Sequence, residues 1–286
     1  MRYWHAAVAR IAVVHLVREA HGPAPFEAFL RAYRRHPAGV EHDLIFVWKG
    51  FRDLAVLDSY RRRAADLVFQ AFSVRDWGYD IRAYGVALRR LSHEYFCFLN
   101  SFSEPLVADW LALLFRHAQQ PDVGLAGATG SWESMYRNCF LPSPPGLTGA
   151  PPVLRWRFAR RILCRVMFPP FPNWHVRTNA FVVRRSLALE CWPRWIFCKR
   201  HAYLFENGRW SLTRRILARG LRVVVVGRDG RAYLPQEWPG SRTYRSGRQE
   251  NLLVADRQTR AYEEADPATR HWLADLAWGE AAVPAS

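Results

Sequence analysis

The chain has 286 residues and a formal net charge of +16, and 50% of its residues are hydrophobic and 14% aromatic. This apolar content is sufficient for a buried core, and it excludes an acidic, disordered chain. Only two of the 41 basic residues, Lys49 and Lys199, are lysine. The arginines are spread from end to end and no nucleic-acid-binding motif is present, so we predict no nucleic-acid partner.

The cysteines and the first apolar run bear on the compartment. The five cysteines are odd in number and include no C-x-x-C pair, which favours a reducing compartment over a zinc site or a disulfide framework. The apolar run 6–17 is interrupted by Arg10 and His15 and is too short to cross a bilayer. We therefore predict a cytoplasmic protein without a transmembrane segment.

The first third of the chain alternates between short apolar runs and amphipathic segments. Strands are predicted where β-branched and aromatic residues form continuous short runs, at 11–17, 43–48, 66–71 and 94–99. Helices are predicted where apolar residues recur at helical spacing, at 26–33, at 81–91 and, unless that segment is an irregular crossover, at 53–65. This alternation predicts an α/β, Rossmann-like fold, with a mostly parallel sheet and helices on both faces.

The later part of the chain continues the same alternation. Helices are predicted at 110–117 and 211–218, and strands at 123–128, 181–183 and 221–226. The proline- and glycine-rich stretch 141–152 is predicted to be a loop within the domain, because further strands follow it. We therefore expect one domain over residues 1–230 and a short helical C-terminal extension, 231–286, that packs on it.

The polar residues that follow each strand are the first place to look for a site, because ligands of open α/β sheets bind beyond the carboxyl ends of the strands. Arg18 follows the first strand, and the polar segments 76–80 and 100–104 follow later ones. Further polar stretches lie near residues 175 and 206.

Several of these segments occur in the order of a known family. Asp76-Trp-Gly-Tyr-Asp80 precedes a helix, and Asn100-Ser-Phe-Ser-Glu104 leads to Pro105 and a Trp110-Leu111 pair. Phe205-Glu-Asn-Gly208 then follows later in the chain. Between about residues 10 and 230 the chain resembles the GT-A fold nucleotide-diphospho-sugar glycosyltransferases, particularly the family 2 group that builds bacterial polysaccharides. The resemblance implies a GT-A-like sheet.

The resemblance also implies a nucleotide-sugar site at the strand ends. Its candidate residues are Arg18, Asp76, Asp80, Asn100, Ser101 and Ser103. Asn100 and Phe102 stand where the family has the two aspartates of its D-x-D motif, which hold Mg²⁺ or Mn²⁺ against the donor diphosphate.

Three roles are open for this segment. Arginines and backbone N–H groups could neutralise the diphosphate without a metal. Glu104, with Ser103 beside it, could instead form a weaker site for Mg²⁺ or Mn²⁺. In the third case Asn100, Ser101 and Ser103 only cap and turn the chain after the strand.

Glu206 is the residue that the resemblance implies as general base. It would take the proton of an acceptor hydroxyl as that oxygen attacks the anomeric carbon in a single inverting displacement. In the family the base precedes a helix that carries an arginine and ends in glycine, for which Arg214 and Gly220 stand here. Glu206 could alternatively cap a helix over 209–218, since acidic residues favour helix starts.

A second group of candidates lies near the expected acceptor. His175, Arg177, Thr178 and Asn179 are similar to a family segment near the acceptor and diphosphate, and their side chains can bond sugar hydroxyls or phosphate. His175 could equally be a structural hydrogen-bonding residue. Trp132 could stack on a sugar ring or be a buried aromatic residue in a turn.

Residues 155–168 interleave arginines with aromatic residues at helical spacing. This pattern suits an anionic membrane surface, and it suits equally a helix packed on the domain with its arginines in solvent. We therefore expect a cytoplasmic glycosyltransferase, peripheral at the inner membrane face, that moves a sugar from a nucleotide diphosphate to a cell-surface glycan or lipid-linked acceptor. The alternative is a catalytically inactive scaffold of the same fold in glycan assembly.

Overall fold

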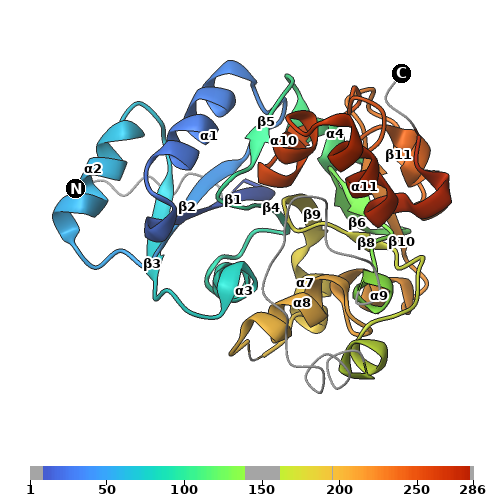
Figure 1. Cartoon of the computed structure of the whole chain (residues 1–286). Coiled ribbons are helices and arrows are strands. Elements are labelled where there is room, and N and C mark those ends of the chain that lie inside the picture. The colour runs from blue at the N-terminus through green and yellow to red at the C-terminus, as the bar shows by residue number, and fades with distance from the viewer. Residues whose placement is uncertain (1–8, 139–161, 195, 284–286) are drawn as a thin grey trace, which may run out of the picture.

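The computed structural model describes residues 9–138, 162–194 and 196–283. Within them, one large sheet runs through the molecule (Figure 1) and has the strand order β11-β10-β6-β9-β4-β1-β2-β3. Its strands are β1 (Ile11–Arg18), β2 (Asp43–Lys49), β3 (Gln70–Val74), β4 (Tyr95–Leu99), β6 (Val123–Gly127), β9 (Ala180–Arg184), β10 (Arg222–Val226) and β11 (Ala232–Tyr233).

The sheet is mostly parallel. Strand β1 pairs in parallel with both β2 and β4, β2 with β3, and β6 with β10. The exceptions are β9, which is antiparallel to β4 and β6, and the edge strand β11. Because the chain leaves β1 toward β2 on one side and reaches β4 on the other, the strand order reverses between β1 and β4, which is where such sheets bind ligands.

Helices cover both faces of the sheet, as the sequence predicts. One face is covered by α1 (Ala24–Arg35), α2 (Leu54–Arg63) and α4 (Trp110–Ala118). The other face is covered by α3 (Tyr79–Arg90), α7 (Arg185–Cys191), α8 (Lys199–Asn207) and α9 (Leu212–Leu217). Alternate residues of β1 enter different cores, Ile11 and Val13 facing the first group of helices and Ala12 and Val14 the second. Both faces are therefore buried, which explains the continuous apolar runs.

The strand predicted at 66–71 lies later in the chain, as β3. Val68 is 97% exposed, and the residues that pair with β2 are Gln70 to Val74. The reason is that β3 is an edge strand, so it buries less of its surface than the central strands and the most apolar run is a poor guide to its position.

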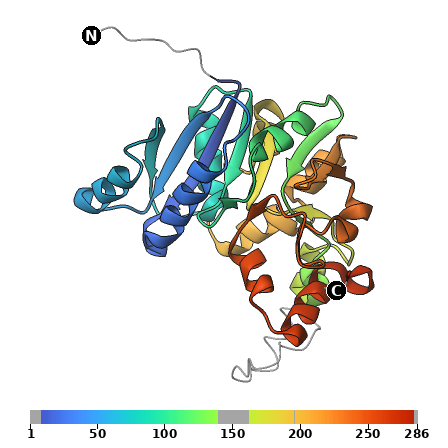
Figure 2. The ribbon, with the colours of Figure 1, turned by 90° about the horizontal axis from the view of Figure 1, so that it is seen from above.

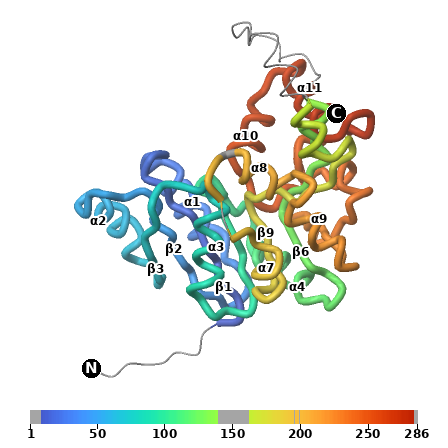
Figure 3. Tube along the Cα trace, turned by 90° about the horizontal axis from the view of Figure 1, so that it is seen from below, coloured from blue at the N-terminus to red at the C-terminus, as the bar shows by residue number. Residues whose placement is uncertain are grey.

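The C-terminal part of the chain lies beyond the carboxyl ends of the central strands (Figures 2 and 3). Strand β12 (Val254–Ala255) pairs with β5 (Glu104–Pro105), and the predicted helical extension contains α10 (Arg257–Glu263) and α11 (Pro267–Trp278). The remaining short elements are η1 (Glu19–His21), β7 (Gly130–Ser131), α5 (Met135–Asn138), β8 (His175–Val176), η2 (Pro235–Ser241) and η3 (Gly279–Ala281).

Two predicted segments lie wholly or partly outside the described residues. These are the loop 141–152 and the first half of the basic stretch 155–168, of which residues 162–167 are helical. No helix in the described part of the chain is long and apolar enough to cross a membrane.

Candidate functional site

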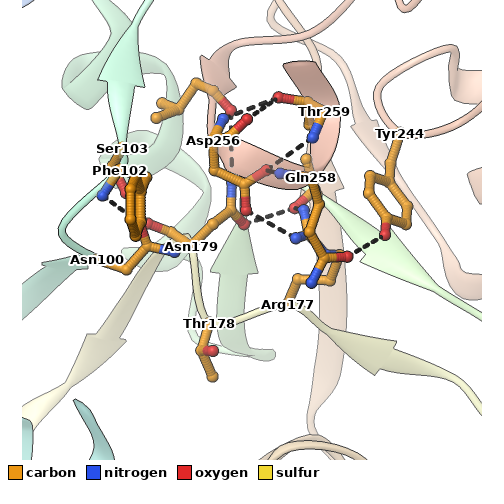
Figure 4. Close-up of polar contacts among 12 residues, drawn as sticks. Asn100, Phe102, Ser103, Arg177, Thr178, Asn179, Tyr244, Asp256, Gln258 and Thr259 are labelled. Carbon is orange, nitrogen blue, oxygen red and sulfur yellow. Dashed lines mark hydrogen bonds and ion pairs between the residues drawn. The ribbon is translucent and has the colours of Figure 1, made fainter. Parts of the chain in front are cut away.

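A cavity of about 540 Å³ opens beyond the carboxyl end of β4, between α3, α8 and the C-terminal helices. This volume is within the usual range for small-molecule sites. Its polar lining combines residues from distant parts of the chain, including Asp80, Asn100, His175, Thr178, Glu206 and Arg257. Figure 4 shows the part of this region around β4, β9 and α10.

Glu206 lies in the last turn of α8 and lines the cavity. The Thr178 hydroxyl donates a hydrogen bond of 3.2 Å to its Oε1 atom. The alternative that Glu206 caps the following helix is wrong, because α9 begins at Leu212 and its N-cap is Ser211, whose Oγ accepts from the backbone N–H of Arg214. The carboxylate therefore belongs to the cavity rather than to a helix start.

Asp80 brings a second carboxylate to the same cavity from the first turn of α3. Burial raises its pKa above the usual aspartate value, and the opposing charges of Lys49 and Arg18 only partly offset this. Perturbed carboxylates of this kind are typical of functional sites.

Arg18 and Asp76 pair with each other at the end of β1. The Arg18 guanidinium donates two hydrogen bonds of 2.9 Å to the two carboxylate oxygens of Asp76. This bidentate contact holds the pKa of Asp76 below its usual range. Lys49 lies buried behind the pair and donates to the backbone oxygens of Trp77 and Tyr79 at 3.1 and 2.8 Å. Together these contacts fix the turn 76–80 that separates β3 from α3.

His175 is buried at the wall of the cavity. Burial lowers its pKa to about 4, so the ring is neutral at physiological pH. Its Nδ1 atom lies 2.8 Å from the backbone oxygen of Asn173, and a neutral ring must donate there. Nε2 is consequently the unprotonated nitrogen, and it can accept a hydrogen bond from a ligand hydroxyl.

Arg177 lines the cavity but is already neutralised. Its Nη2 atom lies 2.7 Å from Oδ2 of Asp256, and both side chains are at most 10% exposed. Burial alone would lower the pKa of Arg177, but the charges of Asp256 and Tyr244 outweigh it and hold the pKa above the usual value. Its guanidinium also lies over the Tyr244 ring, 4.1 Å from the centroid.

The residues at the end of β4 bond to one another (Figure 4). The Asn100 side-chain oxygen accepts hydrogen bonds from the backbone N–H of Phe102, at 2.9 Å, and the Ser103 hydroxyl, at 3.1 Å. Ser103 is fully buried and also lies 2.5 Å from the backbone oxygen of Asn179. Asn179 in turn accepts from Thr129, so its side chain is part of the wall. Asn100 and Ser103 therefore cap and turn the chain, although Asn100 also faces the cavity.

This segment does not fit a divalent cation. Glu104 lies outside the main cavity and forms a bidentate ion pair with Arg260, with atom distances of 2.9 and 2.6 Å. Among the described residues, no group of three His, Cys, Asp or Glu side chains is placed to hold a metal ion. Mg²⁺ and Mn²⁺ need several oxygen ligands, and the side-chain oxygens of Asn100, Ser103 and Glu104 already have protein partners.

Trp132 is packed in the protein and does not line the cavity. Its ring contacts Trp278 edge-on, with centroids 5.9 Å apart, and its indole N–H donates a hydrogen bond of 2.8 Å to the backbone oxygen of Pro235. The buried-aromatic alternative for Trp132 describes this arrangement, while its neighbours Ser131 and Glu133 line the cavity instead.

Several lining residues come from the C-terminal segment, which the sequence reading treats only as a helical extension. They are Tyr244, Arg245, Asp256, Arg257, Gln258, Trp272, Leu273 and Leu276. The sequence carries a local helix-start signal for Asp256 and Gln258, because Asp256 caps α10 and accepts hydrogen bonds from the backbone N–H groups of Gln258 and Thr259. That signal marks a helix start and says nothing of where the helix lies.

A second cavity, of about 630 Å³, lies at the carboxyl ends of β2 and β3. Gly50 and Phe51 line one side, and Arg75, Asp76 and Trp77 the other. Gly50 has a φ of +87°, and a side chain there would lie 3.0 Å from Asp76, so glycine allows the two walls to approach. The turn 76–80 connects this cavity to the first, because Asp76 lines one and Asp80 the other.

No protein-family model and no curated protein sequence matches the chain. The fold matches solved structures, among them the mannosyltransferase PcManGT from Pyrobaculum calidifontis in complex with GDP-Man and Mn²⁺. That match has a TM-score of 0.50 and 12% identity over 82% of this chain. The chain has a GT-A-like fold. This GT-A-like chain spans 60% of the length of PcManGT.

Two further structures are more distantly similar. TarS 1-349 from S. aureus has a TM-score of 0.40 at 11% identity, over 73% of this chain and 55% of its own. The 4-diphosphocytidyl-2C-methyl-D-erythritol synthase from Anaerococcus prevotii DSM 20548 has a TM-score of 0.43 at 11% identity, over 76% of this chain and 88% of its own. Only the fold of this chain follows from the match to PcManGT.

Proposed function

We propose that the protein is a glycosyltransferase that moves a sugar from a nucleotide diphosphate to a hydroxyl group of a glycan or lipid-linked acceptor. The observation that carries this proposal is the cavity at the strand ends, where Glu206 lies together with Asp80, His175 and Thr178. Carboxylates, a neutral imidazole and a hydroxyl are groups that bind and deprotonate sugar hydroxyls.

In the proposed reaction Glu206 is the general base. The acceptor oxygen forms a bond to the anomeric carbon while the bond from that carbon to the donor phosphate breaks, and the nucleoside diphosphate leaves. The acceptor proton passes to Glu206, and the attack inverts the anomeric carbon. The hydrogen bond from Thr178 to Oε1 holds the carboxylate in orientation.

The two cavities suggest how the donor is divided between them. We assign the nucleoside to the cavity at the ends of β2 and β3, and the sugar and acceptor to the cavity around Glu206. The diphosphate then lies near the turn 76–80 and the end of β1, where the strand order reverses.

The experiment is a panel of UDP-, GDP-, dTDP- and CDP-sugars, assayed for binding by calorimetry and for transfer or donor hydrolysis. For the active donor, Glu206→Gln should lower turnover by about 10²- to 10⁴-fold, because it removes the proton acceptor, and should leave donor affinity nearly unchanged. Glu280→Gln, an exposed residue outside both cavities, is the matched control. Unchanged turnover in the Glu206 variant would remove this mechanism.

An inactive scaffold of the same fold is the second candidate. Asn100 and Phe102 in place of carboxylates favour it, because a lost metal site is one way for an enzyme to become a binding protein. The same panel separates the two candidates. Donor binding without turnover under any condition would favour the scaffold, and measurable sugar transfer would exclude it.

We further propose peripheral contact with an anionic membrane through the described part of the basic stretch. In residues 162–167, Ile162 and Val166 are 50% and 61% exposed, and Arg209 bonds to the backbone oxygen of Val166 and places the 55%-exposed Trp210 nearby. Exposed apolar groups among arginines suit such a surface. Val166→Glu should lower co-sedimentation with phosphatidylglycerol vesicles. Equal co-sedimentation of the variant and the wild type would contradict the proposal. So would wild-type binding to neutral phosphatidylcholine vesicles that equals its binding to phosphatidylglycerol vesicles.

A further inference from the structure

We infer that this chain binds the donor diphosphate through arginine instead of a divalent cation, and that Arg257 is the side chain that contacts the phosphates. The inference rests on the proposed function, since it assigns the ligand of the same cavity. It also goes beyond it, because the sequence resemblance directs attention to residues 100–104 and not to the C-terminal segment.

The first support is that the ligands for a cation are already engaged. The side-chain oxygen of Asn100 accepts two internal hydrogen bonds, and Glu104 is held by Arg260. Asp256, the nearest carboxylate on the C-terminal side, is bonded to Arg177 and caps α10. A cation beside residues 100–104 would have to break one of these contacts to gain Glu104 or Asp256 as a ligand.

The second support is the contrast among the arginines of the cavity. Arg177 is paired with Asp256, and Arg245 lies 3.7 Å from Glu133 and bonds to Gln258. Arg257 is exposed and has no hydrogen bond or ion pair with any residue in the described part of the chain. Its guanidinium alone can therefore offer two N–H donors to a phosphate without giving up a protein partner.

The third support is where Arg257 lies. It lines the main cavity and also the adjoining cavity of about 340 Å³, next to Phe102 in both. Phe102 contacts the His21 ring, with centroids 4.8 Å apart, at the end of β1. Burial lowers the pKa of His21, and the charges of Arg18 and Arg257 lower it further. Two arginines from separate segments, Arg18 at the end of β1 and Arg257 in α10, thus act on the same ring near the end of β1.

A buried hydroxyl adds a fourth, independent observation. Ser101 is 4% exposed, and its Oγ atom has no hydrogen-bond partner in the structure as described. It lies in a narrow crevice beside Arg18 and His21. Unsatisfied buried hydroxyls are uncommon, because losing the hydrogen bond costs about 1–3 kcal/mol. A phosphate oxygen at the mouth of this crevice would satisfy it.

The test is calorimetry of the full-length protein with UDP, GDP, dTDP and CDP, each in EDTA and in Mg²⁺ or Mn²⁺. For the diphosphate that binds best, affinity should agree within about twofold between EDTA and metal. Arg257→Gln should weaken it by about 10- to 100-fold, the usual effect of a charged hydrogen-bonding contact. Arg257→Lys should restore part of the loss, because it restores the charge without the bidentate geometry.

Arg31→Gln is the matched control, because Arg31 is an exposed arginine on α1 that lines none of the cavities. The affinity of the Arg31→Gln variant for the nucleoside diphosphate should equal that of the wild type. The Arg257→Gln variant and the wild type should also bind the bare nucleoside equally well. Thermal unfolding confirms that each variant is folded. Binding that requires metal, or an unaffected Arg257→Gln variant, would overturn the inference and leave the proposed function standing. If the wild type bound no nucleoside diphosphate, both would fall.

Discussion

His15 is a polar residue in the middle of a buried strand. Its ring is fully buried and stacks on Phe29, with centroids 3.7 Å apart, and neither ring nitrogen has a hydrogen-bond partner among the residues described. Burial lowers its pKa to about 3. His15 therefore behaves at neutral pH as a flat, uncharged core side chain, which is why it does not interrupt the strand.

This burial predicts acid sensitivity. Below pH 6.5 the unfolded chain binds a proton at His15 that the folded chain excludes down to about pH 3, so stability falls as the pH drops through that window. At pH 5 the loss from His15 is about 2 kcal/mol. His15→Leu should reduce the difference between urea unfolding free energies at pH 7.5 and pH 5 by that amount, and His271→Leu, at an exposed position, should not. An identical pH dependence in wild type and His15→Leu would refute the assignment.

At the scale of elements, one ion pair connects the β8–β9 segment to α10. Asp256 bonds to Arg177 and at the same time accepts from the first backbone N–H groups of α10. Breaking a buried pair by removing one partner is far more destabilising than losing a cap alone, because it leaves an unpaired buried charge. The position of α10, and with it Arg257, therefore depends on Asp256.

We expect Asp256→Ala to lower the free energy of unfolding by about 3–5 kcal/mol, as for other buried pairs. Asp256→Asn should be less harmful by about 1 kcal/mol, because its side-chain oxygen can still cap the helix. Asp266→Ala is the control, since Asp266 caps α11 in the same way without a buried charge partner, and should cost only about 1 kcal/mol. Urea denaturation measures all three, and equal losses for Asp256→Ala and Asp266→Ala would disprove the role of the ion pair.

At the scale of the whole molecule, the C-terminal segment completes the fold. Trp238 and Trp278 are fully buried in the same core as the helices α3, α8 and α9. The Trp278 indole N–H donates to the backbone oxygens of Tyr244 and Arg245. The division into a domain over residues 1–230 and a C-terminal extension over 231–286 remains a prediction, and the described residues of that extension contribute to the core.

Truncation after residue 230 should therefore prevent cooperative folding. It would remove both tryptophans and the edge strand β11, exposing apolar surface of β10 and α9. We expect a broad or absent thermal transition and strong binding of a hydrophobic dye, compared with a sharp transition for the full chain. A truncated protein with a sharp, native-like transition would contradict this expectation.

The elements of the fold were largely predictable because their signals are local. Strand β1 is predicted by a continuous apolar run, which is unbroken because both faces of the sheet are buried. Helix α1 is predicted by apolar residues at helical spacing. The predicted position of β3 is wrong because an edge strand carries a weaker apolar pattern. For the candidate site, Asp80, His175, Thr178 and Glu206 follow from motif order, since the ends of parallel strands meet at one edge.

The amino-acid sequence by itself thus determined the fold class, and it predicted the strand-end origin of the candidate site and two of the four carboxylates that line its cavity, Asp80 and Glu206. Only the tertiary structure decided which charges are available. Arg177 is paired with Asp256, 79 residues away, and Glu104 is paired with Arg260, 156 residues away. Arg257, in contrast, lines the cavity without a partner among the described residues. Ion pairing at such separations depends on how the C-terminal segment packs across the strand ends, and no local pattern in the chain encodes that distance.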